Sequence, residues 1–98
     1  AWAAREVERR AGPRTVMICV HADWAVGDPA GFRDTLARAA RAASRYASLV
    51  TVGIVPTRDD PGFGYIQPGG QVEDGVRLVP RLVGRRRGVA LGERIAVA

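Results

Sequence analysis

The expected fold follows from residues 29–55, which read PAGFRDTLARAARAASRYASLVTVGIV. In the first part of this stretch, apolar side chains recur every three or four residues and arginines fill the other side, which is the pattern of an amphipathic helix with one solvated face. Asp28 can accept hydrogen bonds from the first free amides, and Pro29 suits the first helical position. We therefore predict a helix over residues 29–46.

An apolar run lies on each side of this helix. Thr15–Val20 (TVMICV) and Leu49–Val55 (LVTVGIV) are rich in β-branched residues and too short to be helices, and such continuous runs are typical of parallel strands buried on both faces. Because two strands joined through a helix usually form a right-handed crossover, the pattern predicts a parallel βαβ unit and the α/β fold class.

Shorter elements are expected outside this unit. Apolar residues spaced by three and four within residues 4–11 indicate the end of an earlier helix. Short strands are expected at Tyr65–Gln67 and within Val76–Val83, with turn-rich segments before them. The periodic pattern then ends, so we divide the chain into a domain over residues 1–83 and an arginine-rich tail over residues 84–98.

Composition limits the class of protein. The chain has 98 residues, of which 47% are hydrophobic and 26% charged, so neither a disordered chain nor a large two-domain enzyme is expected. It holds no run of about 18 apolar residues, so no membrane partner is expected. The lone Cys19 excludes an intramolecular disulfide and favours the cytoplasm. Since the chain begins with Ala1 rather than Met, we expect an internal fragment of a longer protein.

The positive charge is concentrated near the C-terminus. All fifteen basic residues are arginine, and the absence of lysine excludes Schiff-base chemistry and a P-loop lysine. Residues 1–76 carry nine arginines and nine acidic residues, whereas residues 77–98 carry six arginines and Glu93. The formal charge of +5 therefore belongs to the tail and is only weak evidence for a nucleic-acid partner.

Asp23 is the first candidate for a functional side chain. It follows the expected strand Thr15–Val20, and ligands of open α/β sheets bind beyond the carboxyl ends of the strands. A carboxylate there can hold a divalent cation that also contacts phosphate oxygens; the alternative is a solvated or turn-forming aspartate. Cys19 and His21 alternate with Asp23, which permits a metal or nucleophile site, but a thiol in an apolar run is usually an inert core residue.

Gly62-Phe63-Gly64-Tyr65 is the second candidate site. A dinucleotide-binding fingerprint is excluded, because Gln67 stands where a third glycine belongs and no helix pattern follows. Two glycines around an aromatic ring let the backbone approach a flat ligand such as a sugar, and they also suit a plain tight turn.

Two strings give the chain a resemblance to a known family. Residues 17–28 (MICVHADWAVGD) resemble the apolar strand and P-A-D-H-x-I-x-D string of the sugar nucleotidyltransferases, most closely the mannose-1-phosphate guanylyltransferases. Residues 49–66 (LVTVGIVPTRDDPGFGYI) are similar to that family's L-V-T-x-G-I-x-P-T-x-P-x-T-G-Y-G-Y-I. Both strings occur in the family's order, with a helix pattern between them. The resemblance covers about half of the chain.

The resemblance implies a fold and a reaction. It implies a partial Rossmann-like nucleotidyltransferase domain that forms GDP-mannose and pyrophosphate from GTP and mannose 1-phosphate. Asp23 would help to hold the catalytic Mg²⁺, and Gly62, Phe63, Gly64 and Tyr65 would line the sugar pocket. Phosphoryl-group chemistry of this kind depends mainly on positioning and on neutralising phosphate charge.

The chain also departs from the family pattern. His21 and Trp24 replace the usual proline and histidine beside Asp23, and Gly84-Arg85-Arg86 stands where Glu-Lys-Pro belongs. The family's glycine-rich nucleotide-binding signature has no counterpart in these residues. We therefore expect activity only from a longer enzyme, and the oligomeric state stays open.

Two other interpretations remain open at this point. The run Arg85–Arg87 is the densest cluster of positive charge, and it could bind phosphates in a small noncatalytic nucleic-acid-binding module or be a solvated tail. The chain could equally be a truncated, vestigial product whose sheet edges lack their partners.

Overall fold

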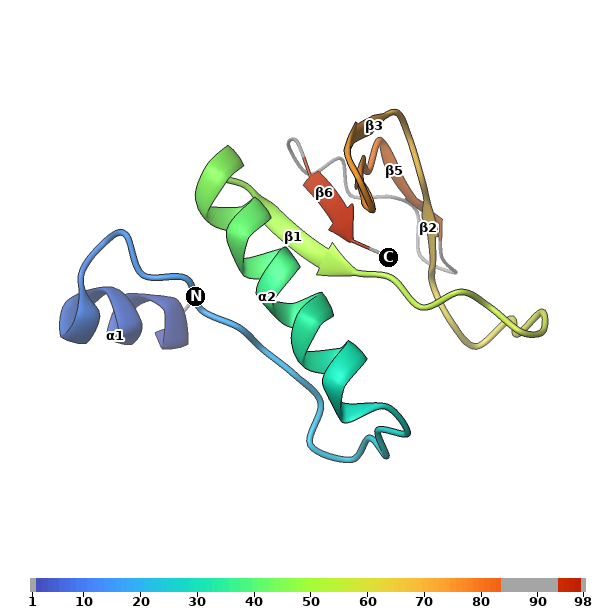
Figure 1. Ribbon diagram of the computed structural model, residues 1–98, viewed down its shortest axis with the longest axis horizontal. Coiled ribbons are helices and arrows are strands. Elements are labelled where there is room, and N and C mark those ends of the chain that lie inside the picture. Colours follow the sequence, from blue (N-terminus) through green and yellow to red (C-terminus); the bar gives the residue numbers. More distant parts are fainter. Residues whose placement is uncertain (1, 84–93, 98) are drawn as a thin grey trace.

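The computed structural model describes residues 2–83 and 94–97. Two helices and six short strands make up this part of the chain (Figure 1). The elements, in chain order, are α1 (Trp2–Ala11), α2 (Pro29–Tyr46), β1 (Leu49–Val52), β2 (Tyr65–Gln67), β3 (Gln71–Glu73), β4 (Val76–Leu78), β5 (Arg81–Val83) and β6 (Arg94–Val97).

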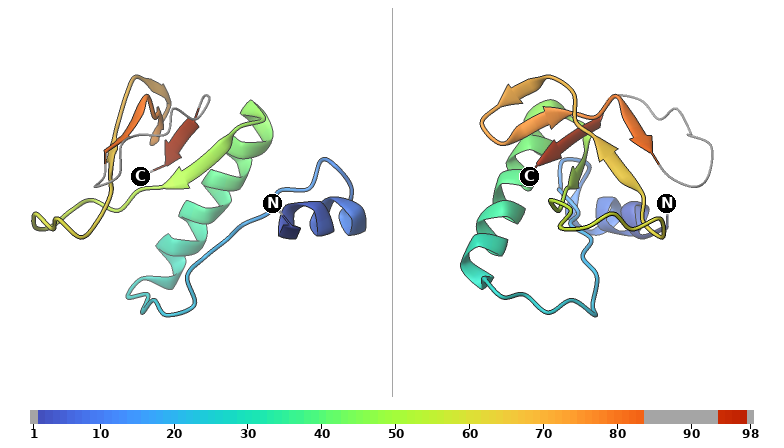
Figure 2. Two further views of the ribbon diagram at one scale, coloured as in Figure 1. Left: turned by 180° about the vertical axis from the view of Figure 1, so that it is seen from behind. Right: turned by 90° about the vertical axis from the view of Figure 1, so that its right-hand side faces the viewer.

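The strands form one four-stranded sheet and one two-stranded sheet. The larger sheet has the order β1-β6-β4-β3, in which β1 and β6 run parallel and the other neighbours antiparallel. The smaller sheet pairs β2 with β5 in antiparallel register. Helix α2 crosses the larger sheet and contacts β1 and β6 (Figures 1 and 2).

Helix α2 has the bounds that the sequence predicts. The side chain of Asp28 accepts a hydrogen bond from the Gly31 amide over 3.0 Å, and Pro29 occupies the first turn. The helix ends at Tyr46 and is capped by Ala47, whose backbone is left-handed with φ 48° and ψ 40°. Its apolar face supplies the centre of the core, because Ala42 is fully buried and belongs to the same cluster as the fully buried Val76.

The predicted strand at Thr15–Val20 is wrong. These residues form no strand, and they run outside both sheets between α1 and α2 (Figure 1). Ile18 and Val20 are 50% and 56% exposed. A strand needs a neighbour for its backbone amides and carbonyls, and the described neighbour of β1 is β6 instead. The expected parallel pairing of residues 15–20 with residues 49–55 is therefore absent.

Two other predicted strands have different bounds in the structure. The strand predicted over Leu49–Val55 ends at Val52, and Ile54 and Val55 are 73% and 75% exposed. The strand candidate Val76–Val83 divides into β4 and β5, which lie in different sheets. Pro80 stands between them and has no amide hydrogen to donate to a ladder, which explains the break.

Three further elements complete the fold. The predicted strand at Tyr65–Gln67 is confirmed as β2, and the predicted earlier helix is confirmed as α1, which carries no buried residue and lies apart from the sheets (Figures 1 and 2). No element is predicted beyond residue 84, yet β6 is a central strand of the larger sheet. No helix that the structure describes is long and apolar enough to cross a membrane.

Candidate functional site

Asp23 lies on an exposed, irregular segment that leads into the N-terminus of α2. The rings of His21 and Trp24 stack on each other beside it, with centroids 4.8 Å apart and planes inclined by 23°. Trp24 is 49% exposed, so this stack leaves aromatic surface in contact with solvent. Cys19 is also exposed, so the expectation that this thiol lies in the core is wrong.

The donor set around Asp23 fits Mg²⁺ only in part. Among residues 2–83 and 94–97, no three His, Cys, Asp or Glu side chains are grouped so that they could hold a metal ion. Mg²⁺ is commonly bound by one or two carboxylates, with waters and substrate phosphates completing the shell. Asp23 can thus supply one ligand of such a shell, but the described residues do not form a metal site by themselves.

The loop that carries Gly62–Tyr65 is organised around Asp60. The Asp60 amide donates to the Tyr65 hydroxyl over 2.7 Å, and that hydroxyl donates to the Asp60 carbonyl over 2.9 Å. The Asp60 carboxylate accepts from the Gly62 amide over 2.9 Å and forms an ion pair with Arg58 at 3.3 Å. These bonds fix the turn on both sides of Phe63.

This arrangement presents an aromatic ring on a fixed turn. Phe63 is 66% exposed, while Tyr65 is half-buried and its hydroxyl is engaged with the backbone of Asp60. A side chain at Gly62 would approach the Asp60 carboxylate to 3.0 Å, so a larger residue would crowd the turn. The turn can therefore offer the Phe63 ring and backbone groups to a flat ligand such as a sugar.

The two predicted site segments are not brought together. Figure 1 shows the segment that leads into the N-terminus of α2 apart from the loop between β1 and β2, which carries Gly62–Tyr65. Arg85–Arg87, the candidate for phosphate binding, lies outside the described residues.

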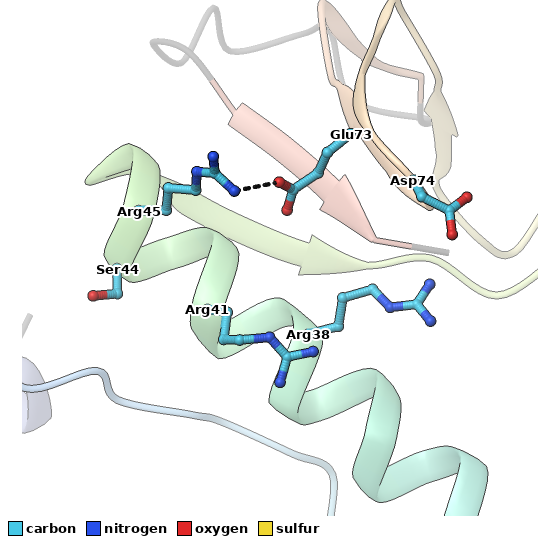
Figure 3. Close-up of a pocket in the computed structure, with 6 residues that line it drawn as sticks. All are labelled: Arg38, Arg41, Ser44, Arg45, Glu73 and Asp74. Carbon is cyan, nitrogen blue, oxygen red and sulfur yellow. Dashed lines mark hydrogen bonds and ion pairs between the residues drawn. The ribbon is translucent and has the colours of Figure 1, made fainter.

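A groove that the sequence analysis did not single out lies between α2 and the β3–β4 turn (Figure 3). It has a volume of about 580 Å³ and is lined by three arginines, one serine and two acidic residues: Arg38, Arg41, Ser44, Arg45, Glu73 and Asp74. The arginine spacing was visible in the sequence as the solvated face of the helix. The carboxylates across from it could not be placed there, because they come from a turn distant in the chain.

The polar contacts of this groove join α2 to β3. Arg45 forms an ion pair with Glu73 at 3.0 Å, and the Tyr46 hydroxyl donates to the same carboxylate over 3.1 Å. Burial raises the pKa of the Tyr46 hydroxyl; the hydrogen bond to Glu73 and the charge of Glu73 raise it further, while Arg45 opposes the shift. The neutral hydroxyl is therefore the form that this contact favours.

One curated protein is similar in sequence to most of this chain. It is the xanthan biosynthesis protein XanB of Xanthomonas campestris pv. campestris, which is 37% identical over 83 residues. The match covers 85% of this chain and 17% of that protein, so the chain spans about a sixth of the length of this relative. No family model matches the chain, and no solved structure matches it significantly. The similarity supports a relation to the sugar nucleotidyltransferases.

Proposed function

We propose that this chain forms part of an enzyme of sugar-nucleotide biosynthesis. The observation that carries the proposal is the 37% identity to a xanthan biosynthesis protein over 83 residues, an interval that must include both family-like strings in a chain of this length. Xanthan is a polysaccharide, and polysaccharides are assembled from activated sugars. The similarity and the two strings therefore support the same class of function.

The reaction we propose is nucleotidyl transfer from GTP to mannose 1-phosphate. A phosphate oxygen of the sugar phosphate attacks the α-phosphorus of GTP. The bond from that phosphorus to the oxygen bridging it to the β-phosphorus breaks. GDP-mannose forms and pyrophosphate leaves with the electron pair of the broken bond. Such a transfer needs aligned reactants and compensation of phosphate charge more than it needs covalent chemistry from the protein.

In the longer enzyme, two parts of this chain that lie apart in the structure (Figure 1) would contribute to binding the sugar and the phosphate. We assign the Phe63 ring and the backbone of Gly62 and Gly64 to the sugar, because the bonds to Asp60 hold this turn in place before a ligand arrives. We assign the Asp23 carboxylate to the binding of Mg²⁺. When bound, the ion neutralises charge on the phosphate oxygens.

We further propose that the chain is one portion of a larger Rossmann-like nucleotidyltransferase domain. Apolar side chains are exposed on the segment before α2 and directly after β1, as Met17, Ile18, Ile54 and Val55 illustrate. Exposed apolar surface of this extent is unusual for a monomeric domain. Further chain packed on these residues, including a strand beside residues 15–20, would bury it.

Binding of mannose 1-phosphate tests the assignment of the Gly62–Tyr65 loop. Saturation-transfer NMR on the 98-residue chain should show contact between the sugar ring protons and aromatic protons of the protein. Phe63→Ala should remove this contact, whereas Trp2→Ala, which removes an exposed aromatic ring of α1, should preserve it. Equal signals from both variants would contradict the assignment.

A further inference from the structure

The groove between α2 and the β3–β4 turn is lined by three arginines and two carboxylates, so its lining carries a net positive charge. Arg45 is paired with Glu73 at 3.0 Å. Arg38 and Arg41 form no ion pair within the part of the chain that the structure describes, although both line the same groove. Residues three apart on a helix are neighbours on its surface, so Arg38 and Arg41 lie next to each other on the side of α2 that lines the groove.

The position of Arg38 depends on the opposite wall of the groove. Its guanidinium group lies against Gly75, where a β-carbon would collide with Nη1. Gly75 has φ +70°, a conformation that glycine adopts without strain. Arg38 is half-buried as a result, whereas Arg41 is exposed. The Arg38 side chain therefore extends from α2 toward the β3–β4 turn, and Arg41 lies one turn further along the helix (Figure 3).

The groove contains hydrogen-bond acceptors as well as cations. Ser44 lies on the helix beside Arg41, and the exposed Asp74 lies on the β3–β4 turn across from the helix (Figure 3). Arginines bind phosphate oxygens through pairs of parallel N–H donors, and carboxylates accept hydrogen bonds from hydroxyl groups. A ligand with an anionic end and a hydroxylated end matches both walls.

We propose that this groove binds a phosphate monoester of a small polyol, with the phosphate on Arg38 and Arg41 and the hydroxyls on Asp74. The volume of about 580 Å³ is in the range of small-molecule sites. Glu73 and Asp74 would repel a second phosphate along a polyanionic chain, so the groove favours a small monoester over a nucleic acid. The site is distinct from the Gly62–Tyr65 loop and belongs to neither end of the proposed reaction.

Calorimetric titration of the 98-residue chain with ribose 5-phosphate tests the proposal. We expect one binding site, with inorganic phosphate binding more weakly and ribose showing no binding. Arg38→Ala and Arg41→Ala should each weaken binding of ribose 5-phosphate roughly tenfold, because each removes charge-assisted hydrogen bonds. Arg33→Ala is the matched control, since this exposed α2 arginine does not line the groove, and it should leave the affinity unchanged.

Other results would overturn the proposal. If Arg33→Ala weakens binding as much as Arg41→Ala does, the interaction is a general effect of charge. If a 12-nucleotide RNA binds more tightly than ribose 5-phosphate, and Arg41→Ala abolishes that preference, the groove is a polyanion site. If Asp74→Ala leaves the affinity ratio of ribose 5-phosphate to inorganic phosphate unchanged, the hydroxyls do not bind to Asp74. Because Arg41 is exposed, its variant keeps the test valid even if Arg38→Ala perturbs folding.

Discussion

The carboxylate of Glu73 accepts a hydrogen bond from the hydroxyl of Tyr46 over 3.1 Å, and so links β3 to the last turn of α2. The same carboxylate pairs with Arg45 at 3.0 Å. The buried hydrophobic core of the described residues is small, with Ala42 and Val76 at its centre and Tyr46 packed against them. This polar link therefore supports the helix at the edge of a core that has little apolar area to hold it.

Replacement of Glu73 should destabilise the fold. Glu73→Ala removes the acceptor of both Tyr46 and Arg45, and we expect the thermal midpoint to fall by about 4–8 °C, the shift that about 1 kcal/mol causes in a domain of this size. Asp74→Ala is the control, because the neighbouring exposed carboxylate forms no described ion pair. Circular dichroism during heating measures both variants, and equal midpoints for the two would contradict the role of Glu73.

The Tyr46 contact also predicts a dependence on alkaline pH. Its raised pKa means that the folded state holds the phenolic proton more tightly than the unfolded state, whose pKa is about 10. The contribution of the Tyr46 contact to the free energy of unfolding is fully present below a pH of about 10. It is lost as the pH rises through the pKa of Tyr46 in the folded state. Urea unfolding at pH 8 and at about pH 11 should show a smaller alkaline loss of stability in Tyr46→Phe than in the unmodified chain.

A side chain at Gly75 should lower the stability of the fold. Its φ of +70° costs an alanine about 1–2 kcal/mol, and the added β-carbon would displace Arg38 from the groove. Gly75→Ala should therefore lower the free energy of unfolding measured in urea by at least that amount. Gly70→Ala is the matched control in the turn before β3, since a β-carbon there meets open space. If Gly75→Ala and Gly70→Ala have the same free energy of unfolding, Gly75 does not adopt the left-handed conformation described for this turn.

Tyr65→Phe should loosen the candidate sugar-binding turn without unfolding the chain. The substitution removes the hydroxyl that donates to the Asp60 carbonyl and accepts from the Asp60 amide. We expect the Asp60 amide to exchange its hydrogen about tenfold faster, which corresponds to the net value of one hydrogen bond. Hydrogen-exchange NMR measures this rate, with the amides of α2 as internal references. An unchanged Asp60 rate would mean that the carboxylate bonds alone hold the turn.

Local signals predict part of this fold well. The bounds of α2 follow from the cap at Asp28, the proline at the first position and the periodicity of its alanines, all of which act within a few residues. The strand Tyr65–Gln67 is likewise enclosed by turn residues on both sides. Such elements depend on neighbours in the chain, so the sequence specifies them directly.

The remaining elements depend on contacts distant in the chain. The run Thr15–Val20 has the composition of a buried strand, but in the described residues β1 pairs with β6 instead. β6 itself has a run too short for any periodicity, and it becomes a strand because β1 and β4 lie on its two sides. The groove between α2 and the β3–β4 turn could not be predicted for the same reason, because residues 73–75 form its second wall and are distant in the chain from α2.

Turnover by the longer enzyme that we propose for these 98 residues tests the central claim most directly. Given GTP, mannose 1-phosphate and Mg²⁺, it should release pyrophosphate and form GDP-mannose, followed by ³¹P NMR. Asp23→Asn should lower turnover at saturating substrates by at least about 10-fold, because the substitution removes the carboxylate that we assign to Mg²⁺. Absence of GDP-mannose, or an unchanged turnover of Asp23→Asn, would contradict the account.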